Sequence, residues 1–269
     1  MKALRVALAV QHCRADAFDE NLRDSLTLIH RAADQGADLV VFPEMNLTGY
    51  VAGENILSIA RPLPRDLEEQ LAQVAEEKKT TLLVGMALKD ESGHVRPTHL
   101  VFVPGCPTAS YCKTHLAPNE QTHFTPGDRA PVFQHPAAKF GIQLCYDSHF
   151  PELTTAMALK GADIIIIPHA SPRGNPRSKF VSWMRHLSAR AFDNGVFVLA
   201  VNQTGDNGQG LTFPGLAIAI GPDGNIIHKY LSMEESLVMV DLDPELMEHV
   251  RSHRMRYFLP NRRQDLFPL

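Results

Sequence analysis

The sequence predicts an α/β protein in which two sheets pack face to face and helices cover the outside. The main observation is a unit that occurs twice, GADLVVFP at residues 36–43 and GADIIIIP at residues 161–168, each after a predicted helix. The strand of each unit is apolar at every position, and such strands must be covered on both faces by helices or by a second sheet. Two copies of the unit therefore indicate a pseudo-symmetric arrangement of two sheets.

The first half of the chain is predicted to alternate strands with helices and then to form a meander. Leu22, Leu26 and Ile29 recur at helical spacing, and a second helix is acidic at its start and basic at its end, as the helix dipole favours. The predicted elements are a strand at 4–10, a helix at 21–35, a strand at 37–43, a helix at 67–79, and strands at 81–88, 98–103 and 110–113.

The second half repeats the alternation and closes with several strands. Its predicted elements are a strand at 139–145, a helix at 152–160, a strand at 163–168, a helix at 179–194 capped by Gly195, and strands at 196–202, 215–220, 225–230 and 236–242. No Pro/Ser-rich linker or block of charge divides the chain. We therefore expect one domain over residues 1–269, with an extended, polar, Arg-rich tail from about Pro244.

Composition and charge exclude several classes of partner. The chain has 269 residues, 44% of them hydrophobic and 21% charged, with a formal net charge of −4. This balance favours neither nucleic acid nor a membrane surface as partner. No apolar stretch reaches the ~20 residues that span a bilayer. The opening residues MKALRVALAVQHC are interpreted as a strand rather than a lipoprotein signal, because Arg5 interrupts the apolar run.

Four cysteines in a chain of this length do not form a disulfide framework, and free thiols fit a reducing cytoplasm. The 13 histidines include no H-E-x-x-H motif, and no C-x-x-C motif is present. We therefore expect a cytoplasmic protein that needs no metal and no cofactor.

One cysteine stands apart as a candidate nucleophile. Cys145 ends the apolar segment KFGIQLC and precedes a predicted helix start. A strand-to-helix turn exposes a side chain above the sheet and aims free backbone N–H groups at it, and these groups can lower a thiol pKa and hold an oxyanion. Cys13, Cys106 and Cys112 are interpreted as small buried or turn residues.

Two charged residues at strand ends complete a set with Cys145. Glu44 follows the buried strand VVFP, and Lys113 ends the short strand SYCK. A carboxylate, an ammonium and a thiol together supply a base, a cation and a nucleophile. His149 is an alternative partner for the thiol, although we favour a solvent-facing histidine at a helix start.

The three segments FPEMNLTGY, YCKTHLAPNE and GIQLCYDSHFPE resemble the three signature blocks of the nitrilase superfamily, the carbon–nitrogen hydrolases. The order, the spacing and the later segments also match, so that the resemblance covers residues 4–241. It implies a four-layer α-β-β-α sandwich of two mixed sheets. It also implies a catalytic triad of Glu44, Lys113 and Cys145, supported by Glu120.

The resemblance further implies how such a site works. The Cys145 thiol attacks a small amide, N-carbamoyl (ureido) or nitrile substrate and forms a thioester, with Glu44 as the proton carrier and with Lys113 and the Tyr146 N–H holding the oxyanion. Lys113 is expected to favour the thiolate. We expect four further residues to line the substrate pocket: Tyr50, His149, His169 and Ala170. A homodimer or higher homo-oligomer is also implied.

Two alternatives remain open. A nitrilase would convert a nitrile to an acid, but family members of that kind often carry Trp-Glu after the cysteine, where this chain has Tyr146 and Asp147. A binding protein on the same fold, with no catalysis, would be expected to lack a triad residue, and all three are present. The sequence therefore favours a thiol amidohydrolase.

Overall fold

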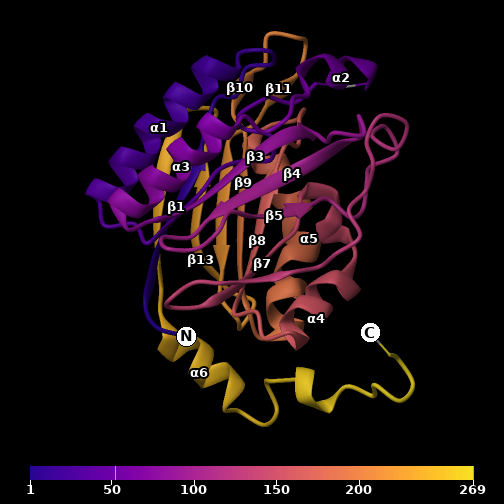
Figure 1. Ribbon diagram of the computed structural model, residues 1–269. Coiled ribbons are helices and arrows are strands. Elements are labelled where there is room, and N and C mark those ends of the chain that lie inside the picture. The colour runs from indigo at the N-terminus through magenta and orange to yellow at the C-terminus, as the bar shows by residue number, and fades with distance from the viewer. Residues whose placement is uncertain (52, 269) are drawn as a thin grey trace.

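The computed structural model describes residues 1–51 and 53–268 and contains two six-stranded sheets (Figure 1). The first sheet has the order β14-β1-β2-β3-β4-β5, and the second has the order β13-β12-β9-β8-β7-β6. The strands of the first sheet are β1 (Leu4–Val10), β2 (Leu39–Val41), β3 (Thr81–Lys89), β4 (Val95–Phe102), β5 (Ala109–Cys112) and β14 (Ser236–Leu242). Those of the second are β6 (Val132–Gln134), β7 (Lys139–Ile142), β8 (Ile164–His169), β9 (Phe197–Asn202), β12 (Leu216–Ile220) and β13 (Ile226–Leu231).

The repeated sequence unit corresponds to a repeated pairing pattern. In both sheets the order of pairings is one antiparallel, two parallel and two antiparallel, with β2 and β8 at equivalent positions. The aspartate of each unit makes equivalent contacts as well. The Asp38 carboxylate accepts the Arg5 N–H at 2.8 Å, and the Asp163 carboxylate accepts the Lys139 N–H at 3.1 Å.

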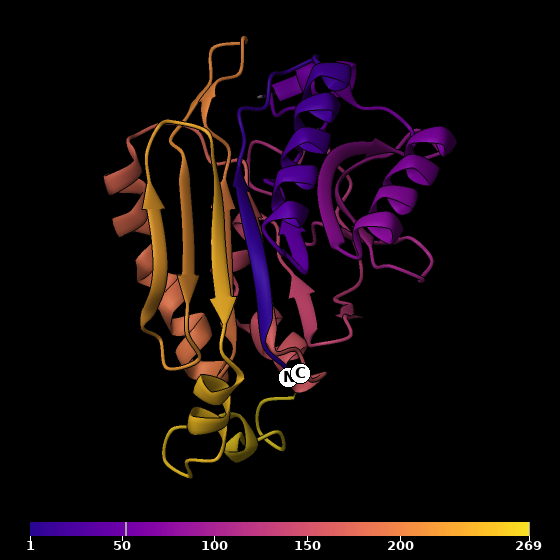
Figure 2. The same ribbon diagram turned by 90° about the vertical axis from the view of Figure 1, so that its left-hand side faces the viewer.

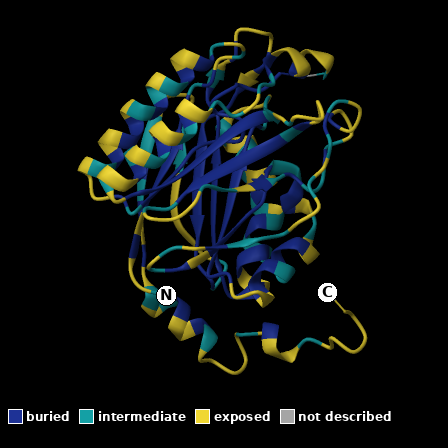
Figure 3. Ribbon diagram, viewed as in Figure 1, coloured by how far each residue is buried: buried dark blue, intermediate teal, exposed yellow. Residues whose placement is uncertain are grey.

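The sheets pack face to face, and helices cover their outer faces (Figure 2). Alternate residues of β1 separate the two sides: Val6, Leu8 and Val10 belong to the core between the sheets, whereas Ala7 and Ala9 pack under helices. On that outer side lie α1 (Phe18–Asp34) and α3 (Arg65–Lys78), and on the other lie α4 (Pro151–Leu159) and α5 (Pro176–Asn194). The predicted four-layer α-β-β-α arrangement is confirmed, and Figure 3 shows most of its strands buried.

Several element boundaries differ from those predicted. Helix α1 begins at Phe18 rather than Asn21, and α5 begins at Pro176 because the Asn175 side chain accepts the Ser178 N–H and caps the helix. Short elements that the sequence did not predict are β6, the hairpin of β10 (Gly205–Asp206) and β11 (Thr212–Phe213), α2 (Ile56–Ile59), and the 3-10 helices η1 (Gly53–Asn55) and η3 (Leu259–Asn261).

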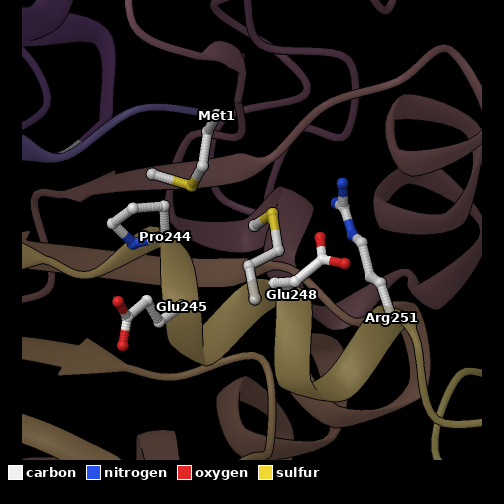
Figure 4. Close-up of a pocket in the computed structure, with 6 residues that line it drawn as sticks. Met1, Pro244, Glu245, Glu248 and Arg251 are labelled. Carbon is white, nitrogen blue, oxygen red and sulfur yellow. The ribbon is translucent and has the colours of Figure 1, made fainter.

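The segment after Pro244 differs from the predicted extended tail, since it begins with helix α6 (Pro244–Arg251). The helix buries Met247 and Val250, and Arg251 donates to the Asp163 carboxylate at 2.8 Å and to the Gly195 carbonyl at 3.0 Å. Figure 4 shows a groove between Met1 and this helix. The groove lies at the N-terminal end of β1, whereas Glu44 and Cys145 follow the carboxyl ends of β2 and β7.

Candidate active site

The predicted catalytic side chains meet where strands of the two sheets end. Glu44 follows β2 and Lys113 follows β5 in the first sheet, while Cys145 follows β7 in the second. A hydrogen bond between the two halves lies at this point, since the Ala170 N–H after β8 donates to Glu44 Oε2 at 3.0 Å. Four strand ends from both halves of the molecule thus contribute to one site.

A buried lysine links two buried glutamates. Lys113 Nζ donates to Glu44 Oε1 at 2.9 Å and to Glu120 Oε1 at 3.0 Å, and its side chain is 1% exposed. Glu120 also accepts the Ala117 N–H at 2.8 Å and the Tyr50 hydroxyl at 3.3 Å. The three side chains therefore carry a net charge of −1 when all are ionised. Such a group is stable in the interior only because its hydrogen bonds are made.

Burial sets the protonation of this group. Removal from water raises the pKa of Glu44 to about 7, with a further rise from Glu120 and an opposing effect of Lys113. Burial alone would lower the pKa of Lys113, but Glu44 and Glu120 raise it well above its ordinary value, so that the ammonium stays charged. A carboxylate with a pKa near neutrality is suited to accept and return a proton at physiological pH.

Cys145 occupies a strained turn. Strand β7 ends at Ile142, earlier than the predicted strand, and Cys145 begins the 3-10 helix η2 (Cys145–His149) with φ +43°. A non-glycine residue in the left-handed region costs about 1–3 kcal/mol, and such strain clusters at active sites. The Tyr146 N–H lies in the first turn of η2, where helix N–H groups have no partner within the helix.

Asp147 holds this turn against the segment that carries Lys113. Its buried carboxylate accepts the Leu144 N–H at 2.9 Å, the Tyr111 hydroxyl at 2.7 Å and the Thr114 hydroxyl at 2.9 Å. Tyr111 lies two residues before Lys113, and Thr114 directly follows it. Asp147 therefore fixes the position of the thiol relative to the ammonium.

The thiol is held in its neutral form. Burial, followed by the charge of Glu44, raises the pKa of Cys145 to about 12, although Lys113 acts to lower it. Lys113 thus favours the thiolate, as expected, but burial and the nearby carboxylates outweigh its effect. A neutral thiol becomes a strong nucleophile only when a base takes its proton.

The four residues predicted to line the pocket have different environments. The Tyr50 hydroxyl contacts Glu120, and Ala170 contributes its N–H to Glu44. His149 is exposed, with its ring centroid 4.5 Å from that of His186. His169 is buried, its ring centroid lies 3.8 Å from that of Trp183, and neither ring nitrogen has a hydrogen-bond partner among the described residues.

Sequence reasoning missed several supporting residues. The Gln203 amide donates to the Glu44 backbone carbonyl at 2.7 Å, and Arg190 donates to the carbonyls of Ser148 and His149. Lys179 lies near enough to Cys145 for each charge to affect the other. Gln203 follows a buried strand, as Glu44 does, and this position was a signal that could have identified it.

Residues 1–51 and 53–268 contain neither a metal-binding cluster nor a membrane-spanning helix. No cluster of three His, Cys, Asp or Glu side chains there is placed to hold a metal ion. No helix in that part of the chain is both long and apolar enough to cross a bilayer.

Comparisons with known proteins agree with the geometry. The family described as carbon-nitrogen hydrolase matches residues 5–252. Relatives at 30% identity include an (R)-stereoselective amidase of Pseudomonas sp. (90% of this chain, 85% of the relative) and an omega-amidase of Xenopus tropicalis (98% and 95%). An amidase structure from Nesterenkonia sp. has a TM-score of 0.81 at 26% identity, covering 98% of this chain and 95% of its own.

Two facing, pseudo-symmetric sheets with a glutamate, a lysine and a cysteine between their strand ends define an enzyme of the thiol hydrolase class. The chain belongs to the carbon–nitrogen hydrolase family. The predicted family membership is confirmed, and the alternative of a binding protein without catalysis is set aside.

Proposed function

We propose that this enzyme hydrolyses the carbon–nitrogen bond of a small amide or N-carbamoyl compound through a thioester on Cys145. The observation that carries the proposal is the position of Lys113, whose ammonium contacts both Glu44 and Glu120 beside the turn that holds the thiol. This arrangement supplies a nucleophile, a base with a pKa near neutrality and an oxyanion donor in one buried site.

Acylation begins with attack of Cys145 Sγ on the amide carbonyl carbon while Glu44 takes the thiol proton. Negative charge develops on the carbonyl oxygen, where the Lys113 ammonium and the Tyr146 N–H stabilise it. Each donor of this kind is typically worth about 3 kcal/mol. Glu44 then gives its proton to the nitrogen, the carbon–nitrogen bond breaks, and ammonia leaves a thioester.

Deacylation uses the same base. Glu44 takes a proton from water as the water oxygen attacks the thioester carbonyl, and the same donors hold the second oxyanion. The carbon–sulfur bond then breaks, the proton returns to sulfur, and the acid, or a carbamate from an N-carbamoyl substrate, is released. Glu120 keeps Lys113 oriented through both halves because it supplies the second acceptor for that ammonium.

The relatives support the amide over the nitrile. Those described as amidases include the Pseudomonas and Xenopus proteins, and a glutamate-to-glutamine variant of the Nesterenkonia amidase shows covalent addition of the acetamide moiety of fluoroacetamide at its active-site cysteine. Hydrolysis of a nitrile remains the second candidate function, because a nitrilase of Pyrococcus abyssi is also 30% identical to this chain. Tyr146 and Asp147 after the nucleophile favour the first.

We also propose a homo-oligomer in the cytoplasm. Exposed apolar side chains on α5 and β13, namely Val181, Phe192, Ile226 and Ile227, would be covered in a homodimer. All four cysteines are free, which suits a reducing compartment. Light scattering coupled to size exclusion tests the assembly, and a monomer at micromolar concentration would contradict it.

The test of the reaction is intact-mass spectrometry after brief incubation with separate small amides, ureido acids and nitriles. We expect an acyl adduct on the wild type and no turnover in Cys145→Ala, whereas Cys13→Ala and Cys106→Ala keep most of the activity. Adducts and turnover that survive in Cys145→Ala would refute the thiol mechanism. Turnover of nitriles alone would replace the amidase with a nitrilase.

A further inference from the structure

Helix α5 contacts the turn that holds Cys145 through two polar side chains. His186 and Arg190 are four residues apart and therefore lie on one face of the helix. Arg190 Nε donates to the Ser148 carbonyl at 3.1 Å, and Arg190 Nη2 donates to the His149 carbonyl at 3.1 Å. The imidazole of His186 reaches the side chain of Ser148, with Nε2 3.1 Å from the hydroxyl oxygen. Helix α5 thus holds Ser148 through both its backbone and its side chain.

The Ser148 hydroxyl connects this helix face to the nucleophile. Its oxygen lies 2.7 Å from the carbonyl oxygen of Cys145, and because a carbonyl can only accept, the hydroxyl donates its one proton there. The contact with His186 then runs the other way, with Nε2–H donating to the hydroxyl oxygen. Burial, followed by the charges of His149 and Arg190, lowers the pKa of His186 to about 4. The imidazole is therefore neutral near pH 7, with its single N–H at Nε2.

The carbonyl that accepts this hydrogen bond belongs to the peptide group that carries the oxyanion donor. The Cys145 C=O and the Tyr146 N–H are the two ends of one planar unit, so a contact that fixes the carbonyl also fixes the direction of the N–H. Hydrogen bonds in a chain polarise one another, and the N–H of a peptide whose carbonyl accepts is a stronger donor. The left-handed φ of +43° at Cys145 persists only where surrounding contacts hold it, and this is one of them.

The backbone on the two sides of the thiol is held by different residues. Asp147 accepts the Leu144 N–H at 2.9 Å and so holds the segment before Cys145. Ser148 holds the peptide group after it. Loss of the Ser148 hydroxyl should therefore affect the oxyanion donor more than the position of Cys145 Sγ, because the contacts of Asp147 remain.

We propose that Ser148 and His186 are positioning residues for the oxyanion donor, which orient and polarise the Cys145–Tyr146 peptide toward the carbonyl oxygen of the substrate. The inference rests on the function proposed above, in which the Tyr146 N–H stabilises that oxyanion. Both side chains act through the peptide group rather than on the substrate. Because the oxyanion forms only after attack, their loss should lower kcat and leave KM unchanged.

The first test compares two reactions of Cys145. Hydrolysis of the best small amide passes through an oxyanion, whereas methyl methanethiosulfonate has no carbonyl group and simply forms a disulfide at Sγ. In Ser148→Ala we expect kcat for the amide to fall about tenfold, less than the ~10²–10³-fold that loss of a whole oxyanion donor costs. The KM and the rate of disulfide formation at Cys145, followed by peptide mass spectrometry, should keep their wild-type values. Ser188→Ala is the matched control, because this serine of α5 donates to the Met184 carbonyl at 2.9 Å, and the variant should keep the wild-type kcat.

Three outcomes of this test would contradict the proposal. Equal losses in both reactions would overturn it, because Ser148 would then hold the thiol itself. A wild-type kcat in Ser148→Ala would also overturn it and would leave the amidase intact. If the wild type hydrolysed no amide, the proposed function would fall, and this inference with it.

The second test asks whether His186 acts through Ser148. His186→Leu removes the N–H and should lower kcat by about threefold or more, whereas His186→Gln, whose amide nitrogen can donate in place of Nε2, should restore most of it. In the background of Ser148→Ala, His186→Leu should have no further effect, because both changes break the same chain of hydrogen bonds. Losses that multiply in the double variant would overturn the connection, and so would His186→Gln if it were as slow as His186→Leu. Since His186 is only half-buried, its variants also test the proposal if Ser148→Ala is unstable.

Discussion

The carboxyl ends of β2 and β8 have similar backbones, but the polar residues that follow or end these strands differ in their hydrogen bonding. Each strand follows a left-handed glycine, Gly36 at φ +76° and Gly161 at φ +91°. A proline precedes a polar residue at each strand end, Pro43 before Glu44 and Pro168 before His169. At the β2 end, Glu44 is paired with Lys113 and with the Ala170 N–H. At the β8 end, neither ring nitrogen of His169 has a hydrogen-bond partner in the parts of the chain that the structure describes.

The difference shows how a duplicated scaffold can support two roles. Groups of the protein itself complete the hydrogen bonding of Glu44, so that the base is oriented before a substrate arrives. The unpaired nitrogens of His169 leave hydrogen bonds for something else to make. We propose that one strand end serves proton transfer and that the other contacts the substrate.

The largest expected effect comes from removing the cation at the β2 end. Lys113→Ala deletes an oxyanion donor and leaves Glu44 and Glu120 facing one another, so that one of them binds a proton. We expect kcat/KM to fall on the order of 10⁴-fold or more, the combined range for the loss of an oxyanion donor and of a general base. Steady-state assays on the best amide measure it. Lys113→Arg should not restore the activity, because a planar fork does not replace a compact ammonium; recovery above about a tenth of the wild-type rate would contradict the assignment.

The second prediction concerns the protonation of Glu44. Because burial raises the pKa of its carboxyl to about 7, and because the base must be ionised, kcat/KM should fall about tenfold per pH unit as the pH drops below 7. Above pH 7 the activity should stay level over several units, since the pKa of Cys145 is raised to about 12. Glu44→Gln should lower the plateau by ~10²–10⁴-fold and abolish the acid limb. Glu120→Gln is the matched control and should retain the limb; a limb that persists in Glu44→Gln would assign the titration to another group.

Much of this site could be predicted from the sequence because its residues follow apolar strands. Glu44 and Cys145 occupy strand ends that are visible in the chain itself, and the repeated Gly-Ala-Asp unit indicated the two sheets. The end of β7 at Ile142, three residues before Cys145, could not be predicted in this way. Leu144 continues the apolar pattern, but its N–H donates to the Asp147 carboxylate and is already part of the turn.

The roles that escaped prediction depend on contacts between distant segments. Asp147 acts through Tyr111 and Thr114, more than thirty residues away, and nothing in its own neighbourhood indicates that they meet. The burial of α6 depends likewise on Arg251 reaching Asp163. The position of Lys179 was easier to predict, since its spacing to Trp183 follows the helix period and places both on one face.

A third, smaller effect is expected at the β8 end. His169→Leu removes two unpaired nitrogens at little cost in volume, so the free energy of unfolding should stay within about 1 kcal/mol of the wild type. The value of kcat/KM for the best amide should nevertheless fall about tenfold if the imidazole contacts the substrate. Denaturant unfolding and steady-state assays on that amide measure the two quantities. A loss of several kcal/mol in stability would mean that the imidazole is paired in the free protein, and the contrast between the two strand ends would then disappear.

The smallest expected effect tests whether strain is stored at the nucleophile. Cys145 is left-handed at φ +43°, and so is Met45 at φ +56°, the residue directly after Glu44. Elsewhere in a fold, replacing alanine by glycine costs stability because the unfolded chain gains freedom. At a left-handed position the order reverses, because glycine adopts that conformation without a clash. We therefore expect Cys145→Gly to be more stable to denaturant than Cys145→Ala by about 1 kcal/mol. Both variants lack the sulfur and are inactive, so the comparison isolates the backbone. If Cys145→Ala proved the more stable, the turn would be relaxed, and the position of the thiol would depend on Asp147 and its partners alone.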